Sequence, residues 1–405
     1  MKIEAIETIY NKNWSNFCWV RVVTEDCLTG LGETFRHPTP IIVYIHDVIA
    51  PYLLGRDALA LARLEHDLRH HGGLRFLGYP TRSVEMRANS AIDIALWDLK
   101  AKAAAEPLYR YLGGPVKDKI RIYNTCASPG YNWTAGNHRA RMAERDSDVV
   151  SAPFDDLIWQ ENDPGGLALS LLEEGITAMK IWPFDRAAET SGGHSISGAE
   201  MDHALSRIGA IRDAVGNRVD ILMEYHSLWH QVPVQRILRE VDAYAPFWHE
   251  DPIPMEDLQG LAELRDMSST PIAGSESHGT VTWVRDAIAA HAVDYLHFDL
   301  GWIGGLSEAL RVAHYAAAHD KLIAPHDCTG PVVWMTNLHL ALSQVNTLWL
   351  ESVRAYYKGL YCDLVTCLPQ ISGGYASAPD AVGLGTDLSE FLLRHPDTEI
   401  RRSSR

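Results

Sequence analysis

The pattern of apolar and polar positions changes twice along the chain. In the first 38 residues apolar and polar positions alternate, through MKIEAIETIY and NFCWVRVVTEDCLTGLGETF. This alternation predicts antiparallel strands with a glycine-rich turn around Gly30 and Gly32. The apolar spacing then becomes helical, and residues 90–105 read as a helix that stops before a proline. Residues 1–118 are therefore expected to form an α+β domain of their own.

Strand–helix alternation follows in residues 119–360. Eight short apolar runs read as buried strands, and amphipathic helical segments separate several of them. The runs are KIRIYNTCA, AMKIWPFD, RVDILMEYH, APFWHEDP, TPIAGSES, VDYLHFDL, KLIAPHDC and TLWLESV. Eight strands in roughly 230 residues fit an α/β fold of the TIM-barrel type, in which the catalytic groups lie at the carboxyl ends of the strands.

The connection between the first two of these strands is too long for an ordinary loop. Residues 128–166 are polar and aromatic, and they are expected to act either as a lid over the site or as a contact between subunits. Residues 361–405 are expected to return to the N-terminal domain and to end in a frayed tail, RRSSR.

Acidic residues close three consecutive strands of this barrel at one fixed interval. Glu224, Glu250 and Glu276 are 26 residues apart in both steps (250 − 224 and 276 − 250). Adjacent strand ends meet at one mouth, where three carboxylates would repel one another unless a cation lay among them. Carboxylate oxygens are the preferred ligands of hard divalent cations, so the spacing predicts a metal site.

Polar residues continue to close the later strands at similar intervals, and these residues are Asp299, His326 and Glu351. Asp299 and His326 close adjacent strands, so the carboxylate can accept a hydrogen bond from one ring nitrogen and fix the tautomer of the other. This arrangement predicts that His326 is a general base near neutral pH. Glu351 is expected to hydrogen-bond a substrate if it is protonated, or to orient a neighbour if it is ionised.

Side chains two apart on a strand face the same way, which adds three residues to the mouth. His226, two after Glu224, is predicted to be a second acid/base group, with metal ligation or a substrate hydrogen bond as alternatives. Lys180 is expected to contact a substrate carboxylate or an enediolate oxygen, or to form a salt bridge with the metal-site glutamates. Trp182 would supply an apolar wall.

Charge and cysteine content narrow the class of partner. Lys and Arg number 36 against 52 Asp and Glu, a net charge of −16, and no dense basic cluster is present. This excludes nucleic acid and anionic membranes as expected partners. The six cysteines have no paired spacing, and no signal peptide or membrane span is evident, so we expect a cytoplasmic enzyme that acts on a small molecule.

Taken together, these residues resemble the enolase superfamily in its mandelate-racemase-like branch. SAIDIALWDLKAKAAAEPLYRYLGG resembles the signature helix of that family's capping domain, and GLGETF and APDAVGLGTDL resemble further motifs. The resemblance implies a modified (β/α)₇β barrel with an N-terminal α+β capping domain. It also implies one Mg²⁺ per subunit held by the three glutamates, removal of the proton α to a carboxylate, and a homo-oligomer.

The second barrel strand separates the activities within this branch. Racemases resemble one another in a Lys-x-Lys motif, which here reads Lys180-Ile181-Trp182. Because the second Lys is replaced, His326 and His226 remain as the acid/base groups. This pattern resembles acid-sugar dehydratases of the galactonate type. We therefore expect Mg²⁺-dependent loss of water from a sugar acid to give a 2-keto-3-deoxy acid. Cycloisomerisation of an anhydro-sugar acid or sugar lactone is the alternative, and a racemase or a non-catalytic sugar-acid binder matches less well.

The identity of the first metal ligand bears on the substrate. The first metal ligand is Glu224, where many relatives carry Asp. Substrate recognition is expected from the capping-domain loops, the insertion and the second barrel strand. The residues expected to contact the substrate are Trp182, Arg36, His37, Tyr79 and Tyr131.

Overall fold

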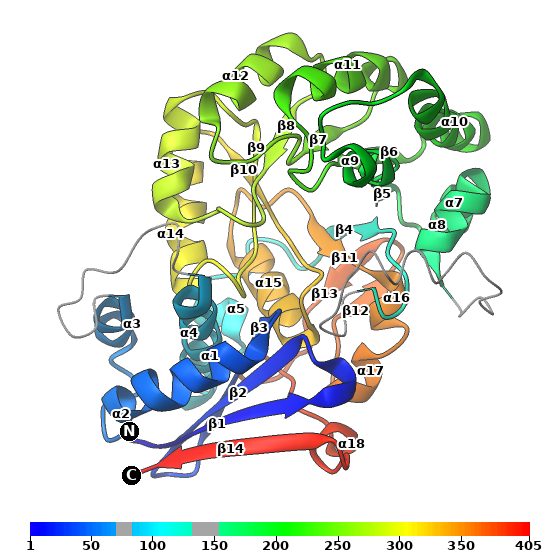
Figure 1. The fold of residues 1–405 in the computed structure, drawn as a ribbon. Helices are drawn as coiled ribbons and strands as arrows, with labels where there is room; N and C mark the ends of the chain where they lie inside the picture. Colours follow the sequence, from blue (N-terminus) through cyan, green and yellow to red (C-terminus); the bar gives the residue numbers. More distant parts are fainter. Residues whose placement is uncertain (70–82, 132–153) are drawn as a thin grey trace.

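An antiparallel sheet with helices packed against it forms the N-terminal part of the computed structural model, which describes residues 1–69, 83–131 and 154–405 (Figure 1). The strand order is β14-β1-β2-β3. The elements are β1 (Ile3–Asn11), β2 (Phe17–Thr24), β3 (Thr29–Phe35), α1 (Pro38–Tyr44), α2 (Ala50–Leu53), α3 (Leu61–Arg69) and α4 (Ser83–Ala103). Alternating apolar residues of the sheet and the apolar sides of these helices share one buried cluster, which we call the capping core.

The two glycines that the sequence placed in a turn lie inside β3, so that prediction is wrong. A Cβ atom at Gly30 would lie 2.0 Å from the carbonyl oxygen of Ala95, and one at Gly32 would lie 1.9 Å from that of Ala91. Glycine is therefore required because α4 packs directly on the backbone of β3. The turn between β2 and β3 is made by residues 25–28 instead.

The C-terminal tail is not frayed, as the sequence predicted, but forms strand β14 (Thr398–Ser404). This strand pairs with β1 in antiparallel register, with Ile400 opposite Ile9, and both chain ends lie at the same edge of the molecule in Figure 1. Arg402 also forms an ion pair with Glu7 on β1 at 2.5 Å. Backbone pairing holds a segment whose side chains are mostly exposed and carry no apolar pattern.

Eight parallel strands form the barrel, one for each apolar run that the sequence contains. They are β4 (Ile120–Thr125), β5 (Ala178–Ile181), β6 (Asp220–Glu224), β7 (Trp248–Glu250), β8 (Ile272–Gly274), β9 (Tyr295–Phe298), β10 (Leu322–Pro325) and β11 (Leu350–Ser352). Neighbours pair in chain order from β4 to β10, and β11 pairs with β4. Backbone hydrogen bonds of 2.9 Å from Ile323 to Asn346 and from Leu348 to Ile323 close the remaining gap.

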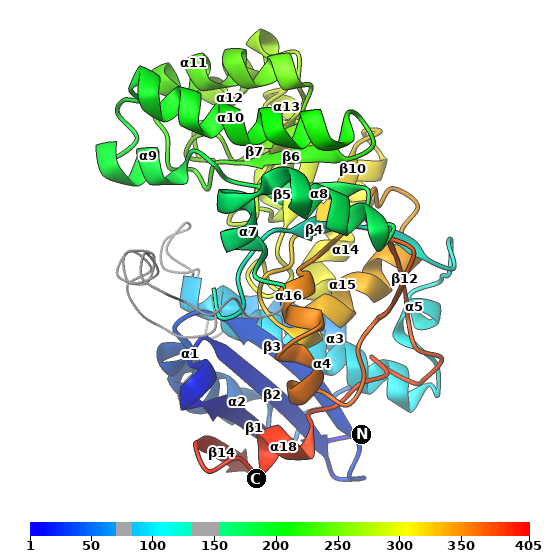
Figure 2. The ribbon, with the colours of Figure 1, turned by 90° about the vertical axis from the view of Figure 1, so that its right-hand side faces the viewer.

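Helices surround the barrel and connect its strands (Figure 2). They are α7 (Asp156–Asn162), α8 (Pro164–Glu173), α9 (Asp185–Ser191), α10 (Gly198–Val215), α11 (Gln231–Val241), α12 (Leu258–Met267), α13 (Val281–Ala289), α14 (Leu306–Ala317) and α15 (Pro331–Ser343). The fold class predicted from the sequence, a modified (β/α)₇β barrel with an α+β capping part, is confirmed. Among helices in the described ranges, none is long and apolar enough to cross a membrane.

The remaining elements join the barrel to the capping part. They are α5 (Leu108–Tyr111), α16 (Arg354–Tyr357), α17 (Tyr361–Leu364), α18 (Glu390–Leu393) and the hairpin of β12 (Gln370–Ser372) and β13 (Tyr375–Ser377), which extends the barrel sheet beside β4. Inside the barrel, Tyr123, Trp248 and Trp349 belong to a buried aromatic cluster. These rings fill the interior, so the barrel is packed and not a pore.

Only the two ends of the predicted insertion, 128–131 and 154–166, fall within the described residues. From Asp156 onward the chain belongs to the outer helices of the barrel. The buried Asp156 carboxylate accepts hydrogen bonds of 2.8 Å from both Asn124 and Arg354. The insertion is therefore shorter than the sequence suggested, and its role as a lid or a subunit contact stays a prediction.

Candidate active site

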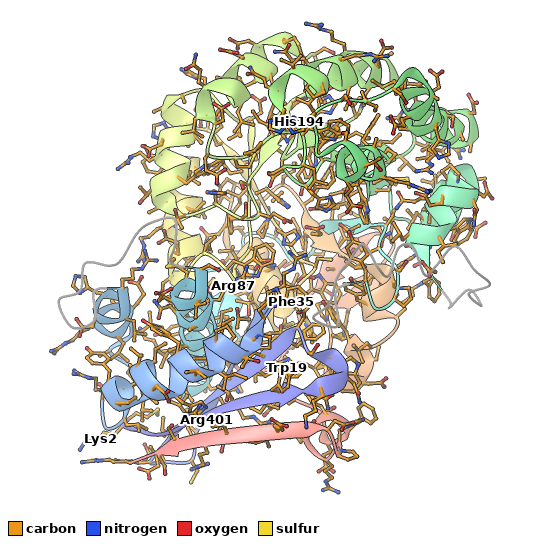
Figure 3. All side chains as sticks on the ribbon, in the orientation of Figure 1. Lys2, Trp19, Phe35, Arg87, His194 and Arg401 are labelled. Carbon is orange, nitrogen blue, oxygen red and sulfur yellow. The ribbon has the colours of Figure 1, made fainter. Side chains whose placement is uncertain are left out.

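A cavity opens where the carboxyl ends of the barrel strands face the end of β3. Figure 3 labels Phe35 and Arg87 at this boundary between the two parts. The cavity is lined by Phe35, Arg36, Thr125, Tyr131, Lys180, Trp182, His226, Glu276, Trp302, His326, Cys328 and Thr329. Most of the residues that the sequence predicted for catalysis and substrate contact thus meet here.

His326 and Asp299 form the pair that the sequence predicted. They directly follow β10 and β9, and Nδ1 of His326 lies 2.7 Å from Oδ2 of the fully buried Asp299. The other ring nitrogen, Nε2, lies 2.9 Å from Oε2 of Glu276. Burial opposes ionisation of the imidazole, but the charges of Glu276 and Glu351 raise the pKa of His326 well above its usual value.

A second pair of the same kind has its histidine in the cavity lining, and Nδ1 of this residue, His226, is 2.7 Å from Oδ2 of Asp185. Burial lowers the pKa of His226, but the adjacent Asp185 carboxylate more than offsets this and raises it. The sequence predicted the position of His226 from a false assumption, that the strand continues past Glu224. In the structure β6 ends at Glu224, and His226 has a left-handed φ of 49°. Asp185 at the start of α9 was missed, since nothing in its local pattern marks it as a partner 41 residues away.

The three glutamates close adjacent strands, but each side chain is held by a different partner. Glu224 faces Glu250 in the strand register, and its Oε1 accepts hydrogen bonds of 2.9 and 2.6 Å from the backbone of Tyr225 and His226. Glu250 is fully buried and binds Lys180 Nζ at 2.8 Å. Glu276 lies two residues beyond β8 and binds His326. Within residues 1–69, 83–131 and 154–405, no three His, Cys, Asp or Glu side chains have the geometry of a metal site.

The chemistry of this donor set nevertheless fits a hard divalent cation. Burial, followed by the charge of Glu250, raises the pKa of Glu224 well above its usual value. Burial and the charge of Glu276 also raise the pKa of Asp251 well above its usual value. Its Oδ1 is buried without a hydrogen-bond partner among the described residues. Four carboxyl groups at three strand ends thus concentrate negative charge, and oxygen-only ligands suit Mg²⁺.

Lys180 lines the cavity and lies among the carboxylates. Its Nζ is 2.8 Å from Glu250, 2.9 Å from Glu351 and 3.6 Å from Glu224. Burial disfavours its charge, but the charges of Glu250 and Glu351 raise the pKa of Lys180 well above its usual value, so it remains a cation. Of the alternatives for Lys180, the salt bridge to the metal-site glutamates is therefore the one present here.

Glu351 does not line the cavity, because it is fully buried below it. Burial favours the neutral form, but Lys180 and the nearby histidines hold the pKa of Glu351 below its usual value. It accepts a hydrogen bond from the hydroxyl of Thr125, which does line the cavity. This favours the second alternative for Glu351, an ionised group that orients its neighbours.

His297 is a further buried residue that the sequence analysis missed. It lies on β9 with Nε2 3.0 Å from Oε1 of Glu250, and its ring is 5.4 Å from that of His326. His297 lies two residues before Asp299. Because side chains two apart on a strand point the same way, it faces the barrel interior with Asp299. That signal was present in the sequence and could have found it.

The predicted substrate-contact residues divide into three groups. Trp182, Arg36 and Tyr131 line the cavity, with the rings of Tyr131 and Trp182 5.6 Å apart. His37 is exposed before α1 and is not among the lining residues, because the left-handed backbone at Arg36 and His37 turns the chain away from β3. Tyr79 lies outside the described residues.

Trp302 was missed as well, although it packs on the His326–Asp299 pair. Its ring centroid is 5.6 Å from that of His326, and the guanidinium of Arg87 on α4 lies 5.3 Å from the same indole. The residue follows Asp299 by three positions in the loop after β9. A loop side chain of this kind carries no periodic signal, so only the fold could locate it.

Comparison with known proteins places both parts of the chain in one family. Residues 5–113 match the N-terminal domain of mandelate racemase / muconate lactonizing enzyme. Residues 166–392 match the enolase C-terminal domain-like family. These two matches correspond to the capping part and to the barrel, respectively.

Relatives of known activity match over most of the chain. The sequence is 28% identical over 386 residues to a D-galactonate dehydratase of Ralstonia pickettii, covering 93% of this chain and 89% of the relative. It is 27% identical over 410 residues to a D-mannonate dehydratase of Rhizorhabdus wittichii, covering 97% and 94% of the two chains.

A solved structure agrees more closely. An enolase of the mandelate racemase subgroup from Agrobacterium tumefaciens is 39% identical, with a TM-score of 0.87 and coverage of 100% of this chain and 99% of that one. The resemblance seen in the sequence is therefore confirmed. This chain belongs to the enolase superfamily, in the mandelate racemase / muconate lactonizing enzyme family.

Proposed function

We propose that this protein is a lyase that removes water from a sugar acid. The observation that carries the proposal is the presence of two histidine–carboxylate pairs, His326–Asp299 and His226–Asp185, whose histidines line one cavity. Elimination of water requires one group to remove a proton and another to protonate the departing hydroxyl. The sugar-acid dehydratases among the relatives supply the substrate class.

His326 is the base in this proposal. Asp299 accepts a hydrogen bond from Nδ1 of His326, so Nε2 is directed to the cavity. In this structure Nε2 contacts Glu276. With Glu276 engaged in holding the cation, the negative charge that raises the pKa of His326 would be compensated, and the neutral Nε2 would be free to remove the proton α to the substrate carboxylate. The buried Asp299 then stabilises the imidazolium that results. Trp302 packs beside the ring and limits its rotation.

His226 is the acid. The charge of Asp185 raises the pKa of its imidazole and so favours the protonated form, and the ring lies against Trp182 at 5.6 Å in an edge-on arrangement. From there it donates a proton to the departing β-hydroxyl, so that water leaves and the enol of the 2-keto-3-deoxy acid forms. Enol and keto forms then interconvert without further demands on the site.

Glu224, Glu250 and Glu276 would hold one Mg²⁺, and Asp251 adds a fourth buried carboxyl group beside them. When bound, the cation supplies positive charge next to the substrate carboxylate, which makes the α proton more acidic. Lys180 balances the remaining negative charge of Glu250 and Glu351. Trp182, Arg36 and Tyr131 contact the rest of the substrate, and Tyr79 stays a prediction for that role.

Incubation of the purified enzyme with Mg²⁺ and a sugar-acid library that includes D-galactonate, D-mannonate and D-gluconate tests the proposal. We expect at least one member to yield a 2-keto acid whose mass is lower than that of the substrate by one water. A product of unchanged mass would indicate cycloisomerisation instead. Failure of every member, together with turnover of another class of substrate, would contradict the dehydratase proposal.

The metal is tested separately by thermal unfolding. Mg²⁺ added after treatment with a chelator should raise the melting temperature of the wild-type protein, because a ligand that binds only the folded state stabilises it. The shift should disappear in Glu250→Gln. Equal shifts in the wild type and in this variant would contradict the assignment of Glu250 as a ligand.

A further inference from the structure

Two consecutive residues at the end of β3 contact the two barrel loops that carry the His326–Asp299 pair. Glu33 is fully buried, and its Oε2 accepts hydrogen bonds of 2.8 Å from the backbone N–H groups of both Val332 and Val333. Thr34 is also fully buried, and its hydroxyl donates to the carbonyl oxygen of Gly301 at 2.9 Å. The capping sheet thus binds each loop through one side chain.

The contact of Glu33 leads to His326. Val332 and Val333 lie in the first turn of α15, the helix that follows the His326 loop, and the side-chain oxygen of Glu33 satisfies two backbone N–H groups that the helix itself leaves unpaired. The loop lies directly against the carboxylate, since a Cβ atom at Gly330 would be 2.3 Å from Cδ of Glu33. Farther along α15, Asn337 Nδ2 donates to the carbonyl oxygen of His326 at 2.9 Å. Glu33 therefore fixes the helix that holds the backbone of His326.

The contact of Thr34 leads to Asp299. The carbonyl of Gly301 is held by Thr34, and its N–H donates to Oδ1 of Asp299 at 2.7 Å. The other oxygen, Oδ2, binds His326. Both carboxylate oxygens of Asp299 are thus committed, one to the base and one to the residue that β3 anchors.

We infer that Glu33 and Thr34 are positioning residues for proton abstraction, and that the end of the capping strand sets the geometry of the His326–Asp299 pair. This inference rests on the proposed role of His326 as the base. A misplacement of about 1 Å at a reacting group can cost roughly 10²-fold in rate, so two anchors outside the barrel have a catalytic consequence. They hold the groups without touching the substrate.

Paired variants separate positioning from simple stabilisation. Glu33→Gln keeps an acceptor oxygen for Val332 and Val333, whereas Glu33→Ala removes it. Thr34→Ser keeps the hydroxyl that binds Gly301, whereas Thr34→Val removes it with little change of volume. We expect kcat to fall about tenfold to 10²-fold in the Ala and Val variants and to return to within about threefold of wild type in the Gln and Ser variants, with KM nearly constant throughout.

The second readout is exchange of the substrate α proton with D₂O, which reports the base step alone. In Glu33→Ala and Thr34→Val it should fall in the same proportion as water loss. The matched control is Ser197→Ala, which removes the cap of another barrel helix, α10, far from the pair. That variant should lose thermal stability and keep kcat. Assays are run below the melting temperature of each variant.

Three results would overturn the inference: reduced stability with unchanged kcat in Glu33→Ala and Thr34→Val, a change in KM alone, or equal activity in the members of each pair. A measurement without substrate decides the inference if no sugar acid is turned over. In ¹⁵N-histidine NMR spectra, assigned with His326→Asn, the His326 ring signals should shift in Thr34→Val and remain near the wild-type position in Thr34→Ser. Unshifted signals in Thr34→Val would contradict the positioning role independently of the proposed reaction.

Discussion

The two sides of the cavity hold similar histidine–carboxylate pairs in different ways. The side chain of His326 is 5% exposed and that of Asp299 is fully buried, and both directly follow barrel strands. The side chain of His226 is 29% exposed and that of Asp185 is 17% exposed. His226 lies in a left-handed turn after β6, and Asp185 begins a helix of seven residues.

This difference matches the demands of two different proton transfers. Removal of a weakly acidic proton needs a base fixed by its surroundings, and the His326 side is fastened both by the barrel and by β3. Protonation of a departing hydroxyl needs a charged acid that reaches the substrate, and the more exposed His226 is held by Asp185, a residue of the barrel. If the account is right, the two sides can be disabled separately.

The largest effect is expected from His326→Asn. General base catalysis contributes roughly 10²- to 10⁴-fold, so water loss and α-proton exchange should both fall by about 10³-fold or more. The amide of Asn can keep a hydrogen bond to Asp299 in place of Nδ1, so the melting temperature should change little. Rapid exchange in this variant would show that another group removes the proton.

A smaller and more selective effect is expected from Asp185→Asn. Loss of the carboxylate removes the cause that raises the pKa of His226, so less of its imidazole carries a proton at neutral pH. Water loss should fall about tenfold to 10²-fold while α-proton exchange continues. Asp202→Asn, an exposed carboxylate on α10, serves as control and should match the wild type. If α-proton exchange fell as much as water loss in Asp185→Asn, the assignment of the two proton transfers to different sides of the cavity would be contradicted.

A further prediction concerns stability and not activity, and it belongs to α15, the helix of the base side. His339 is fully buried between the backbone N–H of Tyr109 and the carbonyl of Leu384, and burial lowers its pKa from 6.5 to about 4. A lowered folded-state pKa means that stability is complete above about pH 6.5 and is lost as the pH falls towards 4. The loss should approach about 3 kcal/mol.

Urea unfolding between pH 4 and 7 in wild type and in His339→Gln measures this contribution. The difference in unfolding free energy between the two proteins should shrink as the pH falls through this window. A difference that stays constant with pH would show that His339 is not held neutral in the folded state.

The strand ends were predictable from the sequence because a barrel repeats at an interval that one sequence can display. Glu224, Glu250, Asp299, His326 and Glu351 all lie in or directly after the predicted strands. Their partners were not predictable, because contacts such as Glu33 with Val332 join residues 299 positions apart. Only the packing of the capping sheet on the barrel brings them together.

Two errors have local physical causes. His226 was placed by assuming that the strand continued, but the chain turns into a left-handed conformation directly after Glu224. The tail was judged frayed because TEIRRSS lacks an apolar face, yet β14 is held by backbone pairing with β1 and by ion pairs such as Arg401 with Asp47. The spacing of apolar residues predicts which side chains are buried. It does not predict a segment that is held by backbone hydrogen bonds and ion pairs.

The measurement that tests the central claim most directly is the ratio of α-proton exchange to water loss in His226→Asn, followed in D₂O with the sugar acid that the wild type dehydrates fastest. With His326 and Asp299 intact, the account predicts that exchange continues within about threefold of the wild-type rate while water loss falls by about 10²-fold or more. Equal loss of both would contradict the assignment of the two steps to opposite sides of the cavity.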